Sequence, residues 1–565
     1  MVPVVIVRVS HGTELLKFAF NPPVVRKRSL ERPAASRLAR RLPQSAAMTD
    51  ANDVVFRRGS AALLDHESSY NPDPQVAPGA SAAVGHTIEN SIPLSIFPIA
   101  ADKLCIIFCG LPGRGKTHIA KRLAQYLSFF HAIPVKVCNV GEYRLNICGA
   151  VKDAEWFDSN NVEANKWRSI CNEKASDDLK EFLLEHSNGI GILDGTNPTH
   201  KRRFELIKKL RPSGAKILFI EVTNDDQTFL TEQYQCAVTS HPDYQGLSSK
   251  EAVVDYRRRI DKYVTYFEPI DSGESSEIES KWSYFKCDHS KQHFVVHNVR
   301  GNLPLKVINF VMNLRTNSHP FYLSRHGQSE YNAVGRIGGD SHLSEHGLAY
   351  AHALAKFVED TITKNSNGEE IPARLWTSTL RRTKETVQFI KQNKIFVKEN
   401  PDSELMTEWI QNRPRAWHHL DELFAGACDG MTYEEIEEKF PQEFERRSVD
   451  KLAYRYPRGE SYLDVIARLE PMIIEMERHR EPLLIVGHQG ILRIIYAFYM
   501  GLTRAEAPYV SIPLNTVIEL VPSAFQCAEK RTVLYTPKKC LPKDGQDEPL
   551  SSSKSNSFNI DPQSH

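Results

Sequence analysis

A glycine-rich segment at residues 110–117 has the residue types and spacing of a loop that holds nucleotide phosphates. It is GLPGRGKT, and it lies between an apolar run and a stretch with helical spacing. In such a loop, backbone N–H groups surround the phosphates, a lysine neutralises their oxygens and a hydroxyl ligates Mg²⁺. The predicted nucleotide-binding residues are Gly110, Gly113, Arg114, Gly115, Lys116 and Thr117, with Thr117 also a metal ligand.

A carboxylate that could complete this site follows a second apolar run, GIGILD, and is Asp194. Phosphoryl transfer needs such a group near the phosphates for metal binding or proton transfer. Considered alone, an aspartate after a strand is more often a turn former or a helix cap. Beside the glycine-rich loop, Asp194 is predicted to bind Mg²⁺, and this half of the chain to transfer a phosphoryl group from a nucleoside triphosphate.

Charged side chains in the other half of the chain are suited to removing a phosphoryl group. Arg325 and His326 follow the apolar run FYL, where an imidazole could attack phosphorus while a guanidinium binds its oxygens. Such a site also needs a second cation, an acid for the leaving alcohol and a second imidazole. Arg382, Glu422 and His488 are the candidates for these roles.

The candidate residues lie where short apolar runs end and polar turns begin. Such runs alternate with helical stretches in two series, separated by NLRTNSHP. Alternating strands and helices are typical of βαβ units and a parallel sheet. We therefore predict an α/β protein of two domains, residues 97–317 and 318–540, each a mainly parallel sheet with flanking helices.

Composition is that of an ordinary globular protein. The 565 residues exceed what one core supports, and 41% are hydrophobic and 25% charged. A net charge of +1 provides no overall basic field for nucleic acid or a membrane surface. The ten cysteines have no metal-ligand spacing, and no apolar run approaches the roughly 18 residues of a membrane span. We expect reduced thiols and a cytoplasmic protein.

The two ends of the chain differ from the rest. Residues 1–96, rich in Ser, Ala, Pro and Gly, and residues 541–565, with little apolar content, are predicted to be disordered. The basic start leaves open a transit peptide, and Met48 leaves open a second start. Two arginines precede Ser60, which indicates either phosphorylation by a basophilic protein kinase or only a solvated basic stretch.

A kinase-type phosphate loop followed by an Arg-His-Gly phosphatase set resembles one family, the 6-phosphofructo-2-kinase/fructose-2,6-bisphosphatases. The resemblance covers about residues 97–535 and includes NVGEYR, MTYEEIEEKFP and YRYPRGESY. It implies a P-loop kinase domain followed by a histidine phosphatase domain of the phosphoglycerate-mutase type. It also implies ATP and fructose 6-phosphate as substrates, synthesis and hydrolysis of fructose 2,6-bisphosphate in the control of glycolysis, and a homodimer.

The resemblance implies roles for individual residues. His326 is the nucleophile and Glu422 the acid and base of the phosphatase, while Lys116 and Asp194 act in the kinase. The fructose 6-phosphate contacts of the kinase are Arg144, Arg168, Thr196, Arg202, Arg259 and Tyr263. The other phosphatase contacts are Arg325, Asn332, Gly338, Arg382, Tyr433, Arg447, Lys451, Tyr462, His488, Gln489 and Arg493.

Three positions of the kinase half depart from the family pattern. Val238 stands where the family has a lysine, Asn224 replaces a cysteine, and Gln233 replaces an asparagine. Loss of one preorganised donor commonly costs about 10²–10³ in rate. We therefore expect a phosphatase-biased enzyme with a weak kinase. The alternative is a phosphatase whose nucleotide-binding domain only regulates it.

Two further classes of function are less well supported. The intact set of five charged phosphatase residues argues against a non-catalytic interaction protein. An enzyme that processes nucleic-acid ends would need a basic patch or an aromatic platform, and the sequence shows neither. The expected ligands are sugar phosphates and ATP, without nucleic-acid or membrane partners.

Overall fold

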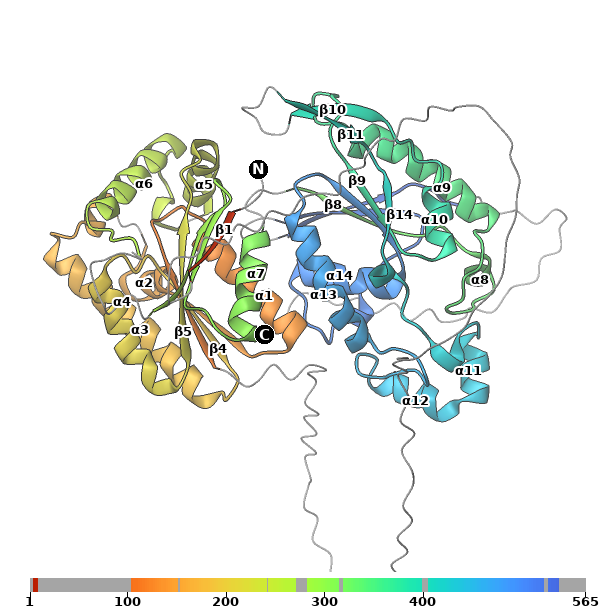
Figure 1. Cartoon of the computed structure of the whole chain (residues 1–565), viewed down its shortest axis with the longest axis horizontal. Helices are drawn as coiled ribbons and strands as arrows, with labels where there is room; N and C mark the ends of the chain where they lie inside the picture. Colours follow the sequence, from red (N-terminus) through yellow and green to blue (C-terminus); the bar gives the residue numbers. More distant parts are fainter. Residues whose placement is uncertain are drawn as a thin grey trace, which may run out of the picture. The chain divides into compact units, whose positions relative to one another are not determined.

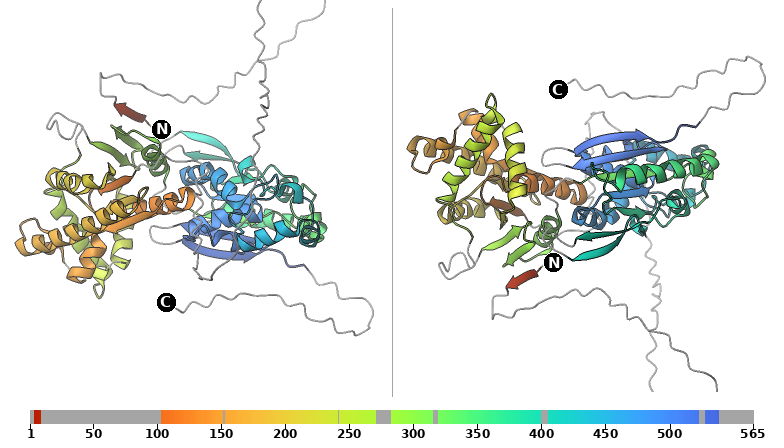
Figure 2. Two further views of the ribbon diagram at one scale, coloured as in Figure 1. Left: turned by 90° about the horizontal axis from the view of Figure 1, so that it is seen from below. Right: turned by 90° about the horizontal axis from the view of Figure 1, so that it is seen from above.

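The computed structural model describes residues 4–8, 103–150, 153–240, 242–270, 282–314, 319–398, 405–522 and 527–537. Met48, Ser60 and the predicted disorder of residues 9–96 and 541–565 lie outside the described residues. The described part contains two large sheets flanked by helices, as the alternating pattern predicts (Figures 1 and 2). None of its helices is long and apolar enough to cross a membrane.

The first sheet has seven strands, and its central strands consist mainly of apolar residues. In spatial order they are β1 (Val4–Arg8), β7 (His293–His297), β6 (Ser283–Asp288), β5 (Lys216–Thr223), β2 (Leu104–Cys109), β4 (Ile190–Asp194) and β3 (Val135–Asn139). All neighbours are parallel except β6 and β7. Every residue of β2 and β4 is buried, because helices cover both faces of the sheet.

The helices of the first half form two layers and one separate pair. One face of the sheet packs against α1 (Lys116–His131) and α7 (Asn302–Asn313), and the other against α3 (Val162–Glu185) and α4 (His200–Leu210), as Figure 1 shows. Helix α2 (Val140–Cys148) follows β3. Helices α5 (Gln227–Ser240) and α6 (Ser249–Val264) pack on each other through an apolar cluster of their own.

Strand β1 corrects the prediction that residues 1–96 are disordered. Val4–Arg8 pairs in parallel with β7, from Val4 opposite His293 to Arg8 opposite His297. The segment VVIVR is rich in β-branched residues, which favour extended backbone in a sheet. The prediction rested on the composition of the whole region, and its Ser- and Pro-rich stretches outweighed this short apolar run.

The second sheet has six strands. In spatial order they are β12 (Pro414–Ala416), β9 (Arg374–Thr377), β13 (Leu483–Gly487), β8 (Phe321–Arg325), β14 (Thr516–Pro522) and β15 (Cys527–Val533). The first four are parallel, while β14 and β15 run antiparallel to their neighbours. A separate antiparallel pair consists of β10 (Lys394–Lys398) and β11 (Met406–Ile410).

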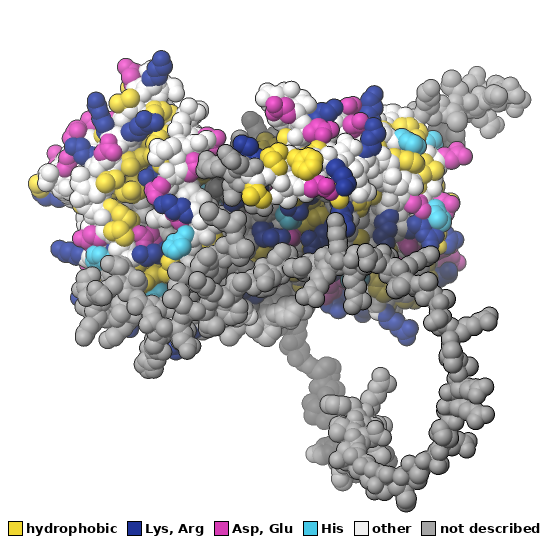
Figure 3. Space-filling view, turned by 45° about the horizontal axis from the view of Figure 1, so that its top comes forward, with side chains coloured by type: hydrophobic (Ala, Val, Ile, Leu, Met, Phe, Trp, Pro, Cys, Tyr) yellow, Lys and Arg dark blue, Asp and Glu magenta, His cyan; other side chains and the backbone are white. Residues whose placement is uncertain are grey.

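The second sheet is also covered on both faces. One face packs against α13 (Tyr462–Arg478) and α14 (Gln489–Met500), and the other against α9 (Glu345–Phe357) and α10 (Arg381–Val387). Three further helices, α8 (Glu330–Ala333), α11 (Tyr433–Lys439) and α12 (Pro441–Val449), belong to the same half. On the face drawn in Figure 3, Lys and Arg side chains are interspersed with Asp and Glu side chains.

Helices α1, α7, α13 and α14 contribute to one shared apolar core. Within it, Arg122 of α1 forms a buried ion pair with Glu477 of α13. The Arg122 guanidinium also lies 5.0 Å from the ring centres of Phe498 and Tyr499. The packing therefore joins α1, which begins at the phosphate loop, to α14, which begins next to His488.

The candidate residues lie at the carboxyl ends of parallel strands. The glycine-rich loop follows β2 and Asp194 ends β4, whereas Arg325 ends β8 and His488 follows β13. Because parallel strands end at a common edge, each sheet collects its own set of functional side chains there.

Candidate active sites

His326 directly follows β8 and is held in one tautomer. Its Nδ1 donates to the carbonyl oxygen of Gly327 at 2.7 Å, and its Nε2 accepts from Nε of Arg382 at 3.1 Å. Burial, together with the charges of Arg382 and Arg325, lowers the pKa of His326 well below its ordinary value. The imidazole is therefore neutral at pH 7, and Nε2 carries the lone pair that an attack on phosphorus requires.

Two guanidiniums lie beside this imidazole, one from buried Arg382 and one from partly buried Arg325. Arg325 donates from Nη1 to the carbonyl oxygen of Ile512 at 3.2 Å, but its Nε has no hydrogen-bond partner among the described residues. Arg382 donates from Nη1 to the carbonyl oxygen of Gly339 at 2.6 Å. Burial lowers the pKa of Arg325 to about 10. Burying cations with incomplete hydrogen bonding is costly, which indicates an anion-binding site.

His488 is fully buried at the start of α14, and its ring centre lies 5.1 Å from that of His326. Its Nε2 is 2.7 Å from Oγ of Ser378, which accepts from the N–H of Leu380 at 3.1 Å. Nδ1 of His488 has no hydrogen-bond partner in the described part of the chain. If the Ser378 hydroxyl donates to Nε2, the proton of His488 is on Nδ1, where it can bind a phosphoryl oxygen.

Glu422 enters the same pocket from the segment after β12. Its Oε1 accepts from the N–H groups of Leu423 and Gly490 at 2.9 and 3.2 Å. Gly490 leaves room for this carboxylate, since a Cβ there would lie 2.6 Å from Oε1. Two backbone donors thus hold the carboxyl group in the position of a proton donor or acceptor.

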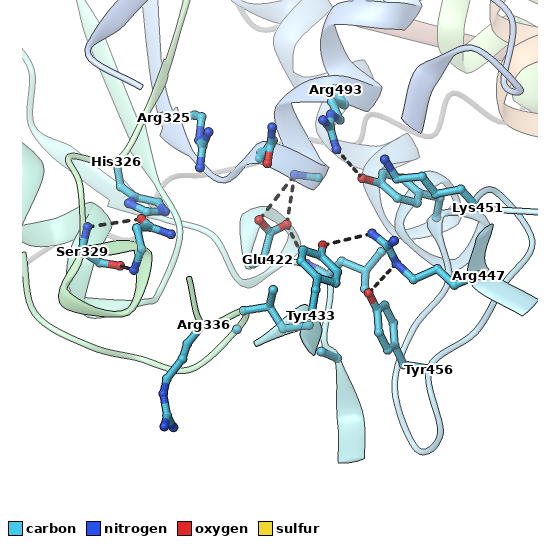
Figure 4. Close-up of a pocket in the computed structure, with 18 of the residues that line it drawn as sticks. Arg325, His326, Ser329, Arg336, Glu422, Tyr433, Arg447, Lys451, Tyr456 and Arg493 are labelled. Carbon is cyan, nitrogen blue, oxygen red and sulfur yellow. Dashed lines mark hydrogen bonds between the residues drawn. The ribbon is translucent and has the colours of Figure 1, made fainter. Parts of the chain in front are cut away.

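Cations and phenols line the rest of the pocket (Figure 4). Arg447 donates to the hydroxyl oxygens of Tyr456 and Tyr433 at 2.8 and 3.0 Å. Nζ of Lys451 donates to the carbonyl oxygen of Pro508 at 2.9 Å, and burial lowers the pKa of Lys451 to about 8. Such a cluster of cations suits a ligand with a second phosphate.

Twelve of the thirteen predicted phosphatase residues line this one pocket, and the thirteenth, His488, is buried beside His326. The twelve are Arg325, His326, Asn332, Gly338, Arg382, Glu422, Tyr433, Arg447, Lys451, Tyr462, Gln489 and Arg493. Gly338 shows why a glycine is needed: its φ is 69°, and a Cβ would lie 1.8 Å from Oδ1 of Asp429. Asn332 accepts from the N–H of Ser329 at 3.2 Å.

In the first half, the glycine-rich loop joins β2 to α1 as predicted. Gly113 and Gly115 have φ values of 74° and 89°, which glycine adopts without strain. Nζ of Lys116 donates to the carbonyl oxygen of Leu111 at 2.6 Å, and burial lowers the pKa of Lys116 to about 8. A bound phosphate would favour the charged form of this lysine.

Asp194 lies beside Thr117 at the end of β4. Its Oδ2 accepts from Nδ2 of Asn139 at 2.5 Å, and the same nitrogen lies 3.5 Å from Oγ1 of Thr117. Asp194 is 2% exposed, and burial raises its pKa. Among the described residues, no group of three or more His, Cys, Asp or Glu could hold a metal. One carboxylate with one hydroxyl still fits Mg²⁺, which binds through few protein oxygens plus substrate phosphates.

Asp243, which was not predicted as a site residue, is the partner of two predicted arginines. Nη1 and Nη2 of Arg144 each donate to its carboxylate at 2.7 Å, and Nη1 of Arg259 lies 3.5 Å from it. The Arg259 guanidinium also lies 3.6 Å from the ring centre of Phe157. These contacts fix both guanidiniums in the wall of the pocket.

One pocket contains most of the predicted kinase residues, namely Gly113, Gly115, Lys116, Thr117, Arg144, Arg168, Asp194, Thr196, Arg202, Arg259 and Tyr263. Gly110 and Arg114 are not among its lining residues. Gly110 lies so close to β5 that a Cβ would be 2.4 Å from the carbonyl oxygen of Val222. Arg114 donates from Nη1 to the hydroxyl of Tyr234 at 3.3 Å.

The three departures from the family pattern lie in different surroundings. Gln233 lines the kinase pocket. Asn224 is buried and accepts from the N–H of Asp226 at 3.0 Å. Val238 is 7% exposed and belongs to the apolar cluster of α5 and α6, which includes Tyr234 and Tyr244. At this position the chain therefore has an apolar contact where the family pattern has a cation.

Comparisons with known proteins agree with these two sites. A family model for 6-phosphofructo-2-kinase matches residues 95–318, and one for the histidine phosphatase superfamily (branch 1) matches residues 321–532. A 6-phosphofructo-2-kinase/fructose-2,6-bisphosphatase of Caenorhabditis elegans is 38% identical over 75% of this chain and 87% of its own. A Saccharomyces cerevisiae relative, named fructose-2,6-bisphosphatase, is 37% identical over the same shares.

The human 6-phosphofructo-2-kinase/fructose-2,6-bisphosphatase 3 is 35% identical over 80% of this chain and 81% of its own. These similarities extend across both halves, in the order kinase then phosphatase. The chain therefore belongs to the family of bifunctional 6-phosphofructo-2-kinase/fructose-2,6-bisphosphatases, which make and hydrolyse fructose 2,6-bisphosphate.

Proposed function

We propose that this bifunctional enzyme hydrolyses fructose 2,6-bisphosphate faster than it synthesises it. The contrast between its two pockets carries the proposal. Twelve of the thirteen predicted phosphatase residues line one pocket and His488 lies beside His326, whereas Val238 of the kinase half is an apolar residue in the cluster of α5 and α6. The similarity to a Saccharomyces cerevisiae protein named for the phosphatase alone also favours this assignment.

In the proposed hydrolysis, Nε2 of His326 attacks the 2-phosphate. The bond from phosphorus to the sugar oxygen breaks, and Glu422 gives that oxygen a proton. Arg325, Arg382 and Nδ1 of His488 bind the phosphoryl oxygens. Water activated by Glu422 then cleaves the phosphohistidine, which releases phosphate and returns the free imidazole.

In the proposed kinase reaction, ATP donates its γ-phosphoryl group to the 2-hydroxyl of fructose 6-phosphate. Lys116 binds the phosphates of ATP, and Arg144, Arg168, Arg202 and Arg259 form the cationic wall for the 6-phosphate. Thr117 and Asp194 would hold Mg²⁺, which when bound neutralises charge on the phosphate oxygens. At position 238 the family has a lysine, and this chain has Val238 instead, so the pocket lacks that cation.

The test is a pair of rates measured on one purified sample. One assay follows ATP-dependent synthesis of fructose 2,6-bisphosphate, and the other follows its hydrolysis. We expect hydrolysis to be faster, by at least about tenfold in kcat. Equal rates would contradict the bias and show that other side chains compensate for Val238.

Ser378 is expected to act as a positioning residue for His488. Ser378→Ala removes the hydroxyl within 2.7 Å of Nε2 and leaves this buried nitrogen without its partner. We expect kcat for hydrolysis to fall about 10- to 100-fold with little change in KM. Ser378→Thr keeps a hydroxyl and should recover most of the rate, whereas an unchanged kcat in Ser378→Ala would exclude this role.

Lys451 should make substrate affinity depend on pH. Since its pKa is lowered to about 8, it loses its charge as the pH rises through that value. We expect KM for fructose 2,6-bisphosphate to rise by up to about tenfold between pH 7 and pH 9. The Lys451→Arg variant stays charged and should lack this rise. A KM of the wild type that is constant over this range would contradict the assignment.

We further propose a cytoplasmic homodimer and phosphorylation of Ser60 by a basophilic protein kinase. The family resemblance supports the dimer, and the arginines before Ser60 support the modification. Sedimentation of the purified chain as a monomer, or failure of protein kinase A to label Ser60, would contradict the respective proposal.

A further inference from the structure

Two cysteines of the kinase half lie in contact with each other. Cys148 is the last residue of α2, and Cys171 lies in α3, three residues after Arg168. Their Sγ atoms are 3.7 Å apart. Cys148 is partly exposed, whereas Cys171 is 1% exposed. A disulfide bond is about 2.05 Å long, so the sulfurs need to approach by only about 1.6 Å to form one.

The two cysteines are close to guanidiniums of the proposed fructose 6-phosphate site. Cys148 lies four residues after Arg144 on α2, and Cys171 lies three residues after Arg168 on α3. Residues at these spacings share one side of a helix. Cys171 itself lines the kinase pocket. A covalent bond between the two sulfurs would therefore tie together the two helices that carry these arginines.

The end of α2 has room to move. Gly149, the residue after the helix, has a φ of 75°, and a Cβ built on it would meet no atom within 4 Å. Nη1 of Arg144 also donates to the carbonyl oxygen of Gly149 at 3.4 Å. A movement of this turn would therefore also move the Arg144 guanidinium. The approach of the sulfurs can thus occur without moving the buried strands of the sheet.

We propose that Cys148 and Cys171 form a disulfide bond under peroxide, and that this bond weakens fructose 6-phosphate binding in the kinase half while leaving the phosphatase half unchanged. The second part rests on the proposed fructose 6-phosphate site. The predicted reduced thiols are then one of two states of this cysteine pair, and the disulfide is the other. Oxidation would lower synthesis of fructose 2,6-bisphosphate while hydrolysis continues.

The chemistry begins at Cys148, which is the accessible thiol. Its thiolate attacks one oxygen of hydrogen peroxide, the O–O bond breaks, and the departing hydroxide takes up a proton to become water. The resulting sulfenic acid lies next to Cys171, whose sulfur attacks Sγ of Cys148. The S–O bond breaks, and the hydroxide leaves as water with the thiol proton of Cys171. Two thiols are oxidised by two electrons, and one peroxide is reduced to two waters.

Burial explains the order of these steps. It raises the pKa of Cys171 to about 12, so this thiol reacts slowly with peroxide in solution. Once Cys148 is a sulfenic acid, the neighbouring sulfur attacks within the same molecule, where proximity compensates for low thiolate content.

The experiment uses the full chain with the exposed thiol of Cys236 as an internal reference. The protein is titrated with hydrogen peroxide, its remaining thiols are alkylated, and non-reduced peptides are identified by mass spectrometry. Calorimetry measures the Kd for fructose 6-phosphate before and after treatment. We expect a linked peptide pair that contains Cys148 and Cys171. We also expect a rise in Kd on the order of tenfold that dithiothreitol reverses, with an unchanged hydrolysis rate.

Two variants make the result specific. Cys148→Ser should lose both the linked peptide and the peroxide-dependent rise in Kd, whereas Cys236→Ser should keep both. Absence of the linked peptide at doses that oxidise Cys236 would overturn the disulfide. A linked peptide without a rise in Kd would overturn its effect on the pocket. Absence of fructose 6-phosphate binding to the reduced protein would instead contradict the proposed kinase function.

Discussion

Replacing His326 with alanine is expected to abolish hydrolysis of fructose 2,6-bisphosphate. The change removes the atom that is proposed to form the phosphohistidine, and loss of a catalytic nucleophile commonly costs about 10⁴–10⁶ in kcat. Folding should be retained, because within the described part of the chain the side chain hydrogen-bonds only to Gly327 and Arg382. The measurement is phosphate release under substrate saturation, together with the incorporation of labelled phosphate into protein.

The kinase half provides the control for this variant. His326 directly follows β8 of the second sheet, so synthesis by His326→Ala should equal that of the wild type and its product should now accumulate. His352→Ala, which removes an exposed histidine of α9, should keep full hydrolysis. Hydrolysis by His326→Ala at more than about a hundredth of the wild-type rate would contradict the nucleophile assignment.

Much of the fold was predictable because the relevant signals are local. An apolar run such as GIGILD marks a buried strand, and the end of that strand places Asp194 at the edge of the sheet. The same argument predicted the positions of His326 and His488 after their strands. The contact between these two histidines follows from parallel strand order, which makes β8 and β13 neighbours.

Contacts between distant segments could not be predicted in the same way. Ser378 lies in the segment WTSTLRRT, but only the fold brings its hydroxyl to His488, 110 residues later in the chain. Asp243 likewise lies 99 residues from Arg144. Hydrogen bonds between short polar side chains that are far apart in the chain leave no periodic pattern in the sequence. The pair Cys148 and Cys171 was missed for the same reason, since a search by spacing finds only metal-type motifs.

Val238 shows a different limit. The sequence identifies the loss of a lysine, and the structure adds that the valine belongs to an apolar cluster with Tyr234 and Tyr244. A lysine introduced there would have to reach the pocket from among aromatic rings. Restoring the family residue alone is therefore a weaker test of the kinase than removing a side chain that already lies in its pocket.

Replacing Lys116 with methionine should reduce synthesis of fructose 2,6-bisphosphate by about 10²–10³ in kcat/KM. Lys116 is 7% exposed, and its Nζ is the cation of the phosphate loop. Methionine keeps much of the side-chain length and removes the charge, so packing of α1 should persist. The measurement is ATP-dependent product formation in the His326→Ala background, where hydrolysis cannot remove the product.

Matched measurements on the Lys116→Met variant distinguish a working kinase from a domain that only senses nucleotide. Lys216→Met, which removes an exposed lysine at the amino end of β5, should leave synthesis unchanged. If synthesis falls in Lys116→Met alone, the P-loop domain is a working kinase despite Val238. If wild type and variant show no synthesis but ATP still changes the rate of hydrolysis, and Lys116→Met removes that effect, the domain is a nucleotide sensor. In that case, the apolar core shared by α1 and α14 is the physical connection between the two sites. Binding of a nucleotide at Lys116 would affect the phosphatase site through this packing.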